Sequence, residues 1–142
     1  MHLSYSQDEK QMLANIDQTK NSIDRNKNSF TKTEKTDSAG YKYIYTKNHT
    51  LQLVLIDYKE QGIDKKVVWY FSGKQLVYAE QTLTNVSSGK LVDNEKVYLS
   101  NGHIIAWLDS QNNKQVADAD KIKAYDVLLA AYSDHLIKEY SK

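Results

Sequence analysis

The sequence contains no cysteine and no proline among its 142 residues. The absence of cysteine excludes a disulfide framework, a thiolate nucleophile and a cysteine-ligated metal site. The absence of proline means that no ring constraint interrupts a helix or a strand. Neither absence identifies a cellular compartment.

An excess of charge and a long hydrophobic run are also lacking. Lys and Arg number 19 and Asp and Glu 18, for a formal net charge of +1. Dedicated nucleic-acid-binding proteins normally carry a basic excess, so we expect no nucleic-acid partner. The longest apolar stretch, Leu51–Ile56, is interrupted by Gln52. It is far shorter than the roughly 20 residues that span a bilayer, so we expect no membrane span.

Tyrosine is abundant, at 11 residues against 2 Phe and 2 Trp. Tyrosine suits half-exposed strand positions, where the ring packs and the hydroxyl stays hydrated. A chain of this length is most simply one domain, residues 1–142.

Helical periodicity marks both ends of the chain. Residues 7–30 carry a thin stripe at alternating spacings of four and three, formed by Met12, Ile16, Thr19, Ile23, Asn26 and Phe30. This predicts a long helix on a sheet, or alternatively a two-stranded coiled coil with Asn26 setting the register. Residues 118–140 carry a second stripe, Ile122, Tyr125, Leu129, Tyr132, Leu136 and Tyr140.

The alternation of residues 41–108 predicts about six antiparallel strands. Asn101-Gly102 suits a type I′ hairpin turn, and Gly73-Lys74 suits a type II′ turn. Regular pairing from these turns places Phe71 opposite Leu76 and Trp69 opposite Tyr78. The polar segment Thr31–Gly40 is expected to be a loop. The long segment Thr82–Glu95 is expected to hide part of a strand. The predicted fold is α+β, an antiparallel meander sheet with both helices on one face.

With regular pairing, the other sheet face carries a row of aromatic residues, namely Tyr41, Tyr43, Tyr45, Tyr70, Tyr98 and Trp107. Exposed aromatic patches commonly mark interaction sites, and Tyr and Trp dominate binding hot spots. These six residues are the candidate binding face. The alternative is ordinary cross-strand stabilisation by aromatic side chains.

No motif points to a catalytic, cofactor or metal site. The four histidines, His2, His49, His103 and His135, lack the spacing of zinc ligands. Asp118, Asp120 and Asp126 could suggest an acidic metal cluster, but the negative charge favoured near a helix N-terminus explains the first two. We therefore expect no cofactor, and whether the protein is an enzyme stays open.

Two related hairpins carry a resemblance. Tyr70–Leu76 and Tyr98–Ile104, followed by Ala106-Trp107-Leu108-Asp109, resemble paired aromatic-aromatic-x-x-Gly-Lys-Leu hairpins of small exported bacterial proteins. The resemblance implies an exported α+β domain, periplasmic or secreted, and no particular activity. Leu3–Gln7 also resembles the end of an export signal.

Three functional hypotheses follow. The first is a non-catalytic module that binds a protein or cell-envelope macromolecule through the open aromatic face, as a monomer or weak dimer. The second is an inhibitor-like module acting through its hairpin tips. The third is a small hydrolase with a cleft between sheet and helix.

Overall fold

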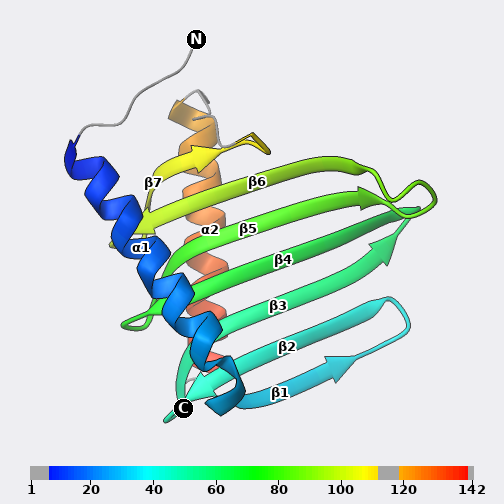
Figure 1. The fold of residues 1–142 in the computed structure, drawn as a ribbon, viewed down its shortest axis with the longest axis horizontal. Helices are drawn as coiled ribbons and strands as arrows, with labels where there is room; N and C mark the ends of the chain where they lie inside the picture. The colour runs from blue at the N-terminus through cyan, green and yellow to red at the C-terminus, as the bar shows by residue number, and fades with distance from the viewer. Residues whose placement is uncertain (1–6, 112–118, 141–142) are drawn as a thin grey trace.

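The computed structural model describes residues 7–111 and 119–140. Helix α1 (Gln7–Asn26) and a short 3-10 turn, η1 (Lys27–Ser29), precede seven strands, and helix α2 (Ala119–Tyr140) follows them (Figure 1). The strands are β1 (Thr31–Thr36), β2 (Gly40–Lys47), β3 (Thr50–Glu60), β4 (Ile63–Ser72), β5 (Gln75–Asn85), β6 (Leu91–Ser100) and β7 (His103–Leu108). They form one antiparallel sheet in sequence order, which confirms the predicted α+β meander. The pattern Leu3–Gln7 lies outside the described residues except for Gln7, as does Asp118.

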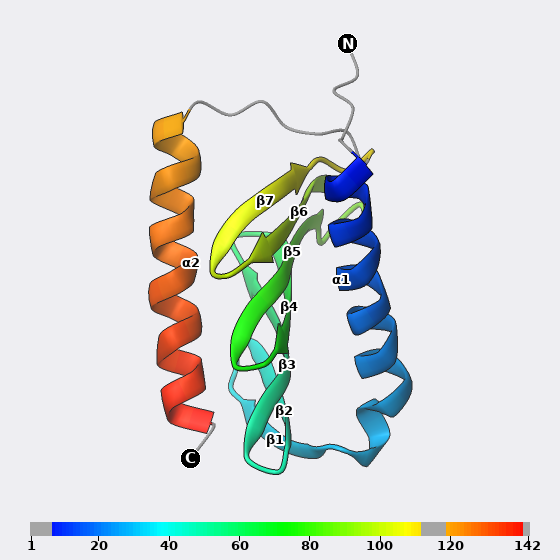
Figure 2. The same ribbon diagram turned by 90° about the vertical axis from the view of Figure 1, so that its left-hand side faces the viewer.

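The two helices lie on opposite faces of the sheet, which corrects the prediction that both share one face (Figure 2). Under α2 lies a core that includes Ile44, Val54, Phe71, Val97, Leu99 and Leu136. Under α1 lies a second core that includes Ile16, Ile23, Leu53, Tyr78 and Leu108. The sheet therefore presents an apolar surface on each side, and each helix buries one of them.

The register differs from regular pairing because each hairpin at the helix-covered end contains a bulge. In these hairpins the irregularities fall between Tyr45 and Thr46, between Tyr70 and Phe71, and between Tyr98 and Leu99. A fourth irregularity, in the pairing of β5 with β6, falls between Leu83 and Thr84. Phe71 still faces Leu76, but beyond the bulge Tyr70 faces Tyr78. A one-residue shift moves side chains to the other face, so Tyr78 and Trp69 lie on opposite sides.

The tight turns have positive φ at both central residues. Asn101 and Gly102 have φ of 52° and 80°, which confirms the type I′ turn predicted there. Gly73 and Lys74 have φ of 57° and 64°, so this turn is also type I′ and the type II′ prediction is wrong.

Strand occupies most of the segment expected to be a loop and part of the long segment after β4. β1 occupies most of Thr31–Gly40, and all six of its residues are exposed. An edge strand without a buried face carries no hydrophobic alternation, so its sequence resembles a loop. In Thr82–Glu95, β5 continues to Asn85 and β6 begins at Leu91, which confirms the hidden strand.

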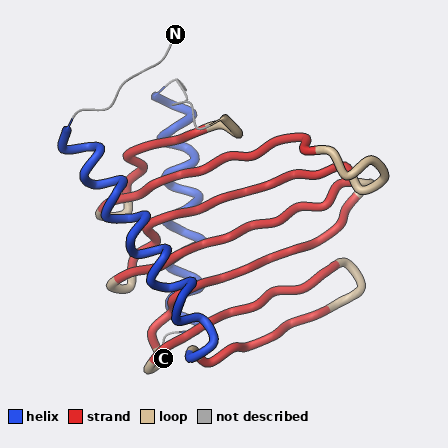
Figure 3. The backbone as a smooth tube through the Cα atoms, in the orientation of Figure 1, coloured by secondary structure: helices blue, strands red, loops and turns tan. Residues whose placement is uncertain are grey.

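Strands β2 to β6 are longer than the helices are wide, so the sheet extends beyond both helices (Figures 1 and 3). We call this region the projecting half. It comprises Gly40–Lys42, Ile56–Glu60, Ile63–Val67, Gln81–Asn85 and Leu91–Glu95, which pair across neighbouring strands. In the described part of the chain, no helix is long and apolar enough to cross a membrane.

Candidate binding surface

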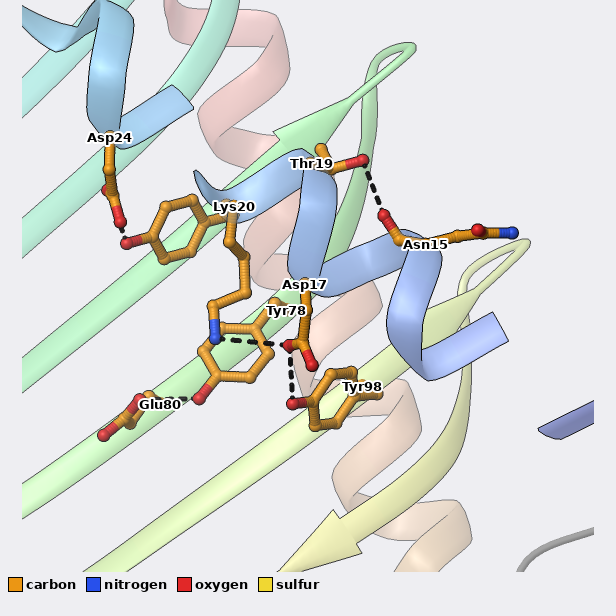
Figure 4. A network of polar contacts seen from close by, with 9 residues as sticks. Asn15, Asp17, Thr19, Lys20, Asp24, Tyr78, Glu80 and Tyr98 are labelled. Atoms are coloured by element: carbon orange, nitrogen blue, oxygen red, sulfur yellow. Dashed lines mark hydrogen bonds and ion pairs between the residues drawn. The ribbon is translucent and has the colours of Figure 1, made fainter. Parts of the chain in front are cut away.

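Three tyrosines from neighbouring strands form a cluster beneath α1 (Figure 4). The ring centroids of Tyr70 and Tyr78 are 5.8 Å apart, and those of Tyr78 and Tyr98 are 5.0 Å apart, both edge to face. Lys20 of α1 places its Nζ atom 3.6 Å from the Tyr78 ring centroid. A cation over an aromatic ring is stabilising, most strongly where water is excluded.

Two hydroxyls of this cluster attach α1 to the sheet, and the third bonds within β5. Tyr70 donates to Asp24 Oδ1 at 2.8 Å, and Tyr98 donates to Asp17 Oδ1 at 2.8 Å. Tyr78 donates to Glu80 Oε1 at 2.6 Å. Burial, followed by these hydrogen bonds, raises the pKa of the Tyr70 and Tyr78 hydroxyls well above the ordinary value. The cluster therefore holds α1 in place.

The six residues of the predicted binding face do not form one open surface. Tyr45, Tyr70 and Tyr98 are 7, 8 and 7% exposed on the α1 side. Trp107 is 7% exposed and lies on the opposite side, in the α2 core. The prediction of an open aromatic face is therefore wrong. Helix α1 covers the tyrosines, and the bulges place Trp107 on the opposite side of the sheet.

Tyr41 and Tyr43 remain accessible. They are half-buried and stack with centroids 4.2 Å apart, next to each other on β2. Lys32 of β1 lies over the Tyr43 ring with its Nζ atom 3.9 Å from the centroid. Sequence reasoning missed Tyr78, because regular pairing had assigned it to the same face as Phe71.

The projecting half has two chemically different sides. On the side of α2 it carries apolar residues, which we call the α2-side strip: Ile56, Tyr58, Ile63, Val67 and Leu83. Lys65 and Gln81 lie among them on the same side, where Lys65 pairs with Leu83 and Gln81 with Val67. On the side of α1 the same strands carry polar and charged residues: Asp57, Lys59, Asp64, Lys66 and Thr84. Alternation of this kind is typical of a strand with one buried face. Within the described residues, neither helix crosses the outer part of these strands (Figures 1 and 2). The strip is nevertheless only partly open, because Val67 is 9% exposed and the other four side chains are half-buried.

Adjoining pockets hollow the α2 side. The first, of about 210 Å³, lies between the strip and the flank of α2, with Trp69, Leu129 and Tyr132 in its wall. Pockets of about 380 Å³ and 300 Å³ share Tyr58 with it and continue toward β2 and toward the outer end of β4. Together they form a groove beside α2 that is apolar next to the helix and lined in part by charged residues toward its ends, such as Lys42 and Glu60.

Lysines border this groove. Lys65 has its Nζ atom 5.7 Å from the Tyr58 ring centroid. At the end near β1, Lys35 lies 3.3 Å from Glu139 Oε1, and Lys42 Nζ lies 5.6 Å from the Tyr140 ring centroid. The contact between Lys35 and Glu139 joins the C-terminal turn of α2 to the edge of the sheet.

A carboxyl pair lies on the α1 side of the projecting half. Burial raises the pKa of Asp57, the neighbouring Asp64 raises it further, and Lys66 and Lys59 oppose this effect. A metal site needs more ligands than two carboxyls. Among the side chains that the structure describes, no group of three or more His, Asp or Glu residues could hold a metal ion.

The remaining candidate sites carry little chemistry. A pocket of about 520 Å³ beside α1 is lined by uncharged residues: Asn15, Gln18, Thr19, Ser22, Ile23, Gln52, Phe71, Ser72 and Gly73. Such a lining offers no titratable group for acid–base catalysis. The hairpin tips at Lys74 and Gly102 border α2 around a pocket of about 150 Å³. His135 lies 3.3 Å from Glu139 along the helix.

Comparison of the chain with protein-family profiles, with curated proteins and with solved structures gave no match.

Proposed function

We propose that the protein is a non-catalytic binding module and that the α2-side strip is its binding surface. The supporting observation is the alternation Ile56-Asp57-Tyr58-Lys59, which places apolar side chains on one side of strands that extend beyond both helices. Apolar surface left in water is unfavourable, at roughly 25 cal/mol per Å². A partner that covers the strip therefore gains free energy that the chain alone does not.

An amphipathic helix is the occupant that fits the groove. About five residues project from each of β3 to β6, and three from β2; five residues span about 16 Å at roughly 3.3 Å per residue. A helix with side chains is about 10–12 Å across, so one helix fits beside α2. The α2 helix packs on the same sheet face through Leu129 and Leu136, and a second helix can use the same mode. An added strand is excluded from this position, because a sheet face offers no free backbone hydrogen bonds.

Two neighbouring residues of β5 provide the test. Leu83 belongs to the strip and Thr84 points to the other side. The probe is a fluorescent amphipathic helical peptide built from Leu, Ala and Glu, with a scrambled peptide of the same composition as its control. We expect Leu83→Lys to weaken binding about tenfold or more, since it places a charge in the apolar contact. Thr84→Lys should leave binding unchanged.

Equal binding of the amphipathic and scrambled peptides would contradict the proposal, as would equal affinities of the two lysine variants. The titrations are run at a protein dilution that dissociates any self-association, so that the peptide does not compete with a second copy of the chain.

Export belongs to the same proposal and stays a prediction, as does the likeness to small exported bacterial proteins. The support is the paired hairpin pattern, Tyr70–Leu76 and Tyr98–Ile104. Finding the protein in a periplasmic or secreted fraction would support it, and a strictly cytoplasmic fraction would contradict it.

A further inference from the structure

One flank of α1 carries amides and hydroxyls and no charged side chain. It is formed by residues at helical spacings of three and four: Gln11, Asn15, Gln18, Thr19, Ser22 and Asn26. Asn, Ser and Thr are weaker helix formers than Ala, Glu or Lys, and most of these positions are exposed. The charged residues Asp17 and Lys20 lie on another side of the helix, next to the tyrosine cluster (Figure 4). Helix stability therefore does not account for this flank.

Hydrogen bonds along the helix hold several of these side chains. Gln11 Nε2 donates to Asn15 Oδ1 at 3.0 Å, and Thr19 Oγ1 donates to the Asn15 carbonyl oxygen at 3.2 Å (Figure 4). Asn26 Nδ2 donates to the Ser22 carbonyl oxygen at 2.8 Å. Side chains that are held in this way lose less conformational freedom when a ligand binds.

A pocket of about 520 Å³ lies between this flank and the end of the sheet where β4 turns into β5. Its opposite wall includes Gln52, Ser72 and Gly73. A Cβ atom at Gly73 would meet no atom beyond its chain neighbours within 4 Å, so the turn leaves the pocket open. The volume lies in the range of roughly 300–1,000 Å³ that small-molecule sites occupy. From Asn15 to Ser22 the helical wall is about 10 Å long, at about 1.5 Å per residue.

We propose that this pocket binds a neutral saccharide of about disaccharide length. A sugar hydroxyl both donates and accepts hydrogen bonds, as do the Asn, Gln, Ser and Thr side chains that line the pocket. Among the described residues, no Lys, Arg or His lines it to pair with a phosphate, sulfate or carboxylate, and no Asp or Glu lines it to pair with a cation. A wholly apolar ligand would deprive the polar groups of their hydrogen bonds to water. An uncharged ligand rich in hydroxyls meets both conditions.

NMR titration of the isotope-labelled full chain provides the first test. The probes are maltose, cellobiose and N,N′-diacetylchitobiose, and a sulfated heparin disaccharide is the charged control. We expect at least one neutral probe, and not the control, to shift the side-chain amide signals of Asn15, Gln18 and Gln52. The affinity should be in the millimolar range, because each hydrogen bond to the ligand replaces one to water. Shifts with no neutral probe, or equal shifts with the charged control, would overturn the proposal.

Two asparagines of α1 provide matched variants for the second test. Asn15 lines the pocket and Asn21 does not, and both are exposed. Asn15→Ala should weaken binding of the neutral probe about three- to tenfold, the usual effect of one lost hydrogen bond, whereas Asn21→Ala should leave the affinity unchanged. Gln52→Ala, on the opposite wall, should weaken binding as Asn15→Ala does. Equal affinities of Asn15→Ala and Asn21→Ala, both folded by circular dichroism, would overturn the site.

The outcomes separate this inference from the proposed function, because the pocket shares no residue with the α2-side strip. Leu83→Lys should leave saccharide binding unchanged, and Asn15→Ala should leave binding of the amphipathic peptide unchanged. A chain that binds the peptide and no neutral saccharide overturns the saccharide site alone. Loss of saccharide binding in Leu83→Lys would overturn the placement of the site beside α1.

Discussion

The two sides of the sheet bury their helices by different means. On the α1 side, tyrosine hydroxyls from the sheet bond to carboxylates of the helix, as Tyr70 does to Asp24. On the α2 side, the contact is aliphatic and aromatic, with Leu136 fully buried against the sheet. The difference continues into the projecting half, where the α1 side is polar and the α2 side carries the apolar strip together with Lys65 and Gln81. The α1 side of the projecting half needs no covering element to be hydrated. The apolar residues of its α2 side resemble part of a core that no helix covers.

The largest expected effect comes from the aliphatic side. Leu136→Ala should lower the free energy of unfolding by about 3–5 kcal/mol, because the cavity forms in a fully buried contact. Ile16→Ala on the α1 side should cost less, about 2–3 kcal/mol, since Ile16 is 9% exposed. Urea denaturation measures both values. Equal losses, or a larger loss for Ile16→Ala, would contradict the contrast between the two sides. Val127→Ala is the control on the exposed side of α2 and should change stability by less than about 0.5 kcal/mol.

The hydroxyl contacts of the α1 side should contribute less per residue. Tyr70→Phe removes the bond to Asp24 and should cost about 1 kcal/mol, a typical net value for one hydrogen bond. Asp24 is exposed and regains water, so no larger penalty is expected.

The same tyrosines predict a response to alkaline pH. The pKa values of Tyr70 and Tyr78 are raised in the folded state, so their contribution is present below the ordinary tyrosine pKa of about 10 and is lost as pH rises above it. Absorbance at the tyrosinate band should show these residues ionising together with unfolding. Ionisation of all tyrosines near the ordinary pKa, with unchanged circular dichroism, would contradict the buried cluster.

A smaller effect is expected at a turn. Lys74 has a φ of 64°, which is unfavourable for a residue with a Cβ atom and free of cost for glycine. Lys74→Gly should therefore stabilise the protein by a few tenths to about 1 kcal/mol, as measured by thermal unfolding. Gly102→Ala provides the reverse substitution at the related turn, where φ is 80°, and should destabilise. Destabilisation by Lys74→Gly would contradict the turn geometry.

The smallest effect concerns the polar side of the projecting half. The pKa of Asp57 is raised in the folded state, so the protonated form is favoured and stability falls as pH rises through this raised pKa. Asp57→Asn should therefore be slightly more stable than the unmodified chain at neutral pH and equal to it in acid. The gain in stability is limited because the charges of Lys66 and Lys59 lower the pKa of Asp57 and so partly offset the effect of its burial. Thermal unfolding across pH measures it, and a neutral-pH loss of stability would contradict the sign.

Local signals predicted the elements, and non-local geometry decided the faces. The spacing of Ile16 and Ile23 predicted the first helix, and Asn101-Gly102 predicted the type I′ turn between β6 and β7. Both patterns depend on only a few neighbouring residues. The bulges leave no comparable mark in the sequence, and each one shifts the register that a turn alone would set. This is why Tyr78 was placed with Phe71, and why Trp107 was grouped with tyrosines on the opposite side.

The alternation of apolar and polar residues in the projecting half is visible in the sequence, but the sequence does not show whether a helix covers the apolar side. Ile56 and Tyr58 alternate with Asp57 and Lys59, which indicates one buried side. Only the placement of α1 and α2 near one end of the strands shows that this side is left without a helix. Sequence patterning specifies which face is apolar, and tertiary packing specifies what covers it.

The most direct test of the contrast between the two sides combines stability and binding in the Leu83→Lys and Thr84→Lys variants. Leu83→Lys should unfold within about 0.5 kcal/mol of the unmodified chain, because its side chain lies on a surface that reaches water. It should nevertheless bind the amphipathic helical peptide about tenfold or more weakly, whereas Thr84→Lys should match the unmodified chain in both measurements. Unchanged affinity in Leu83→Lys, measured on a folded protein, would contradict the claim that the α2 side of the projecting half is a binding surface.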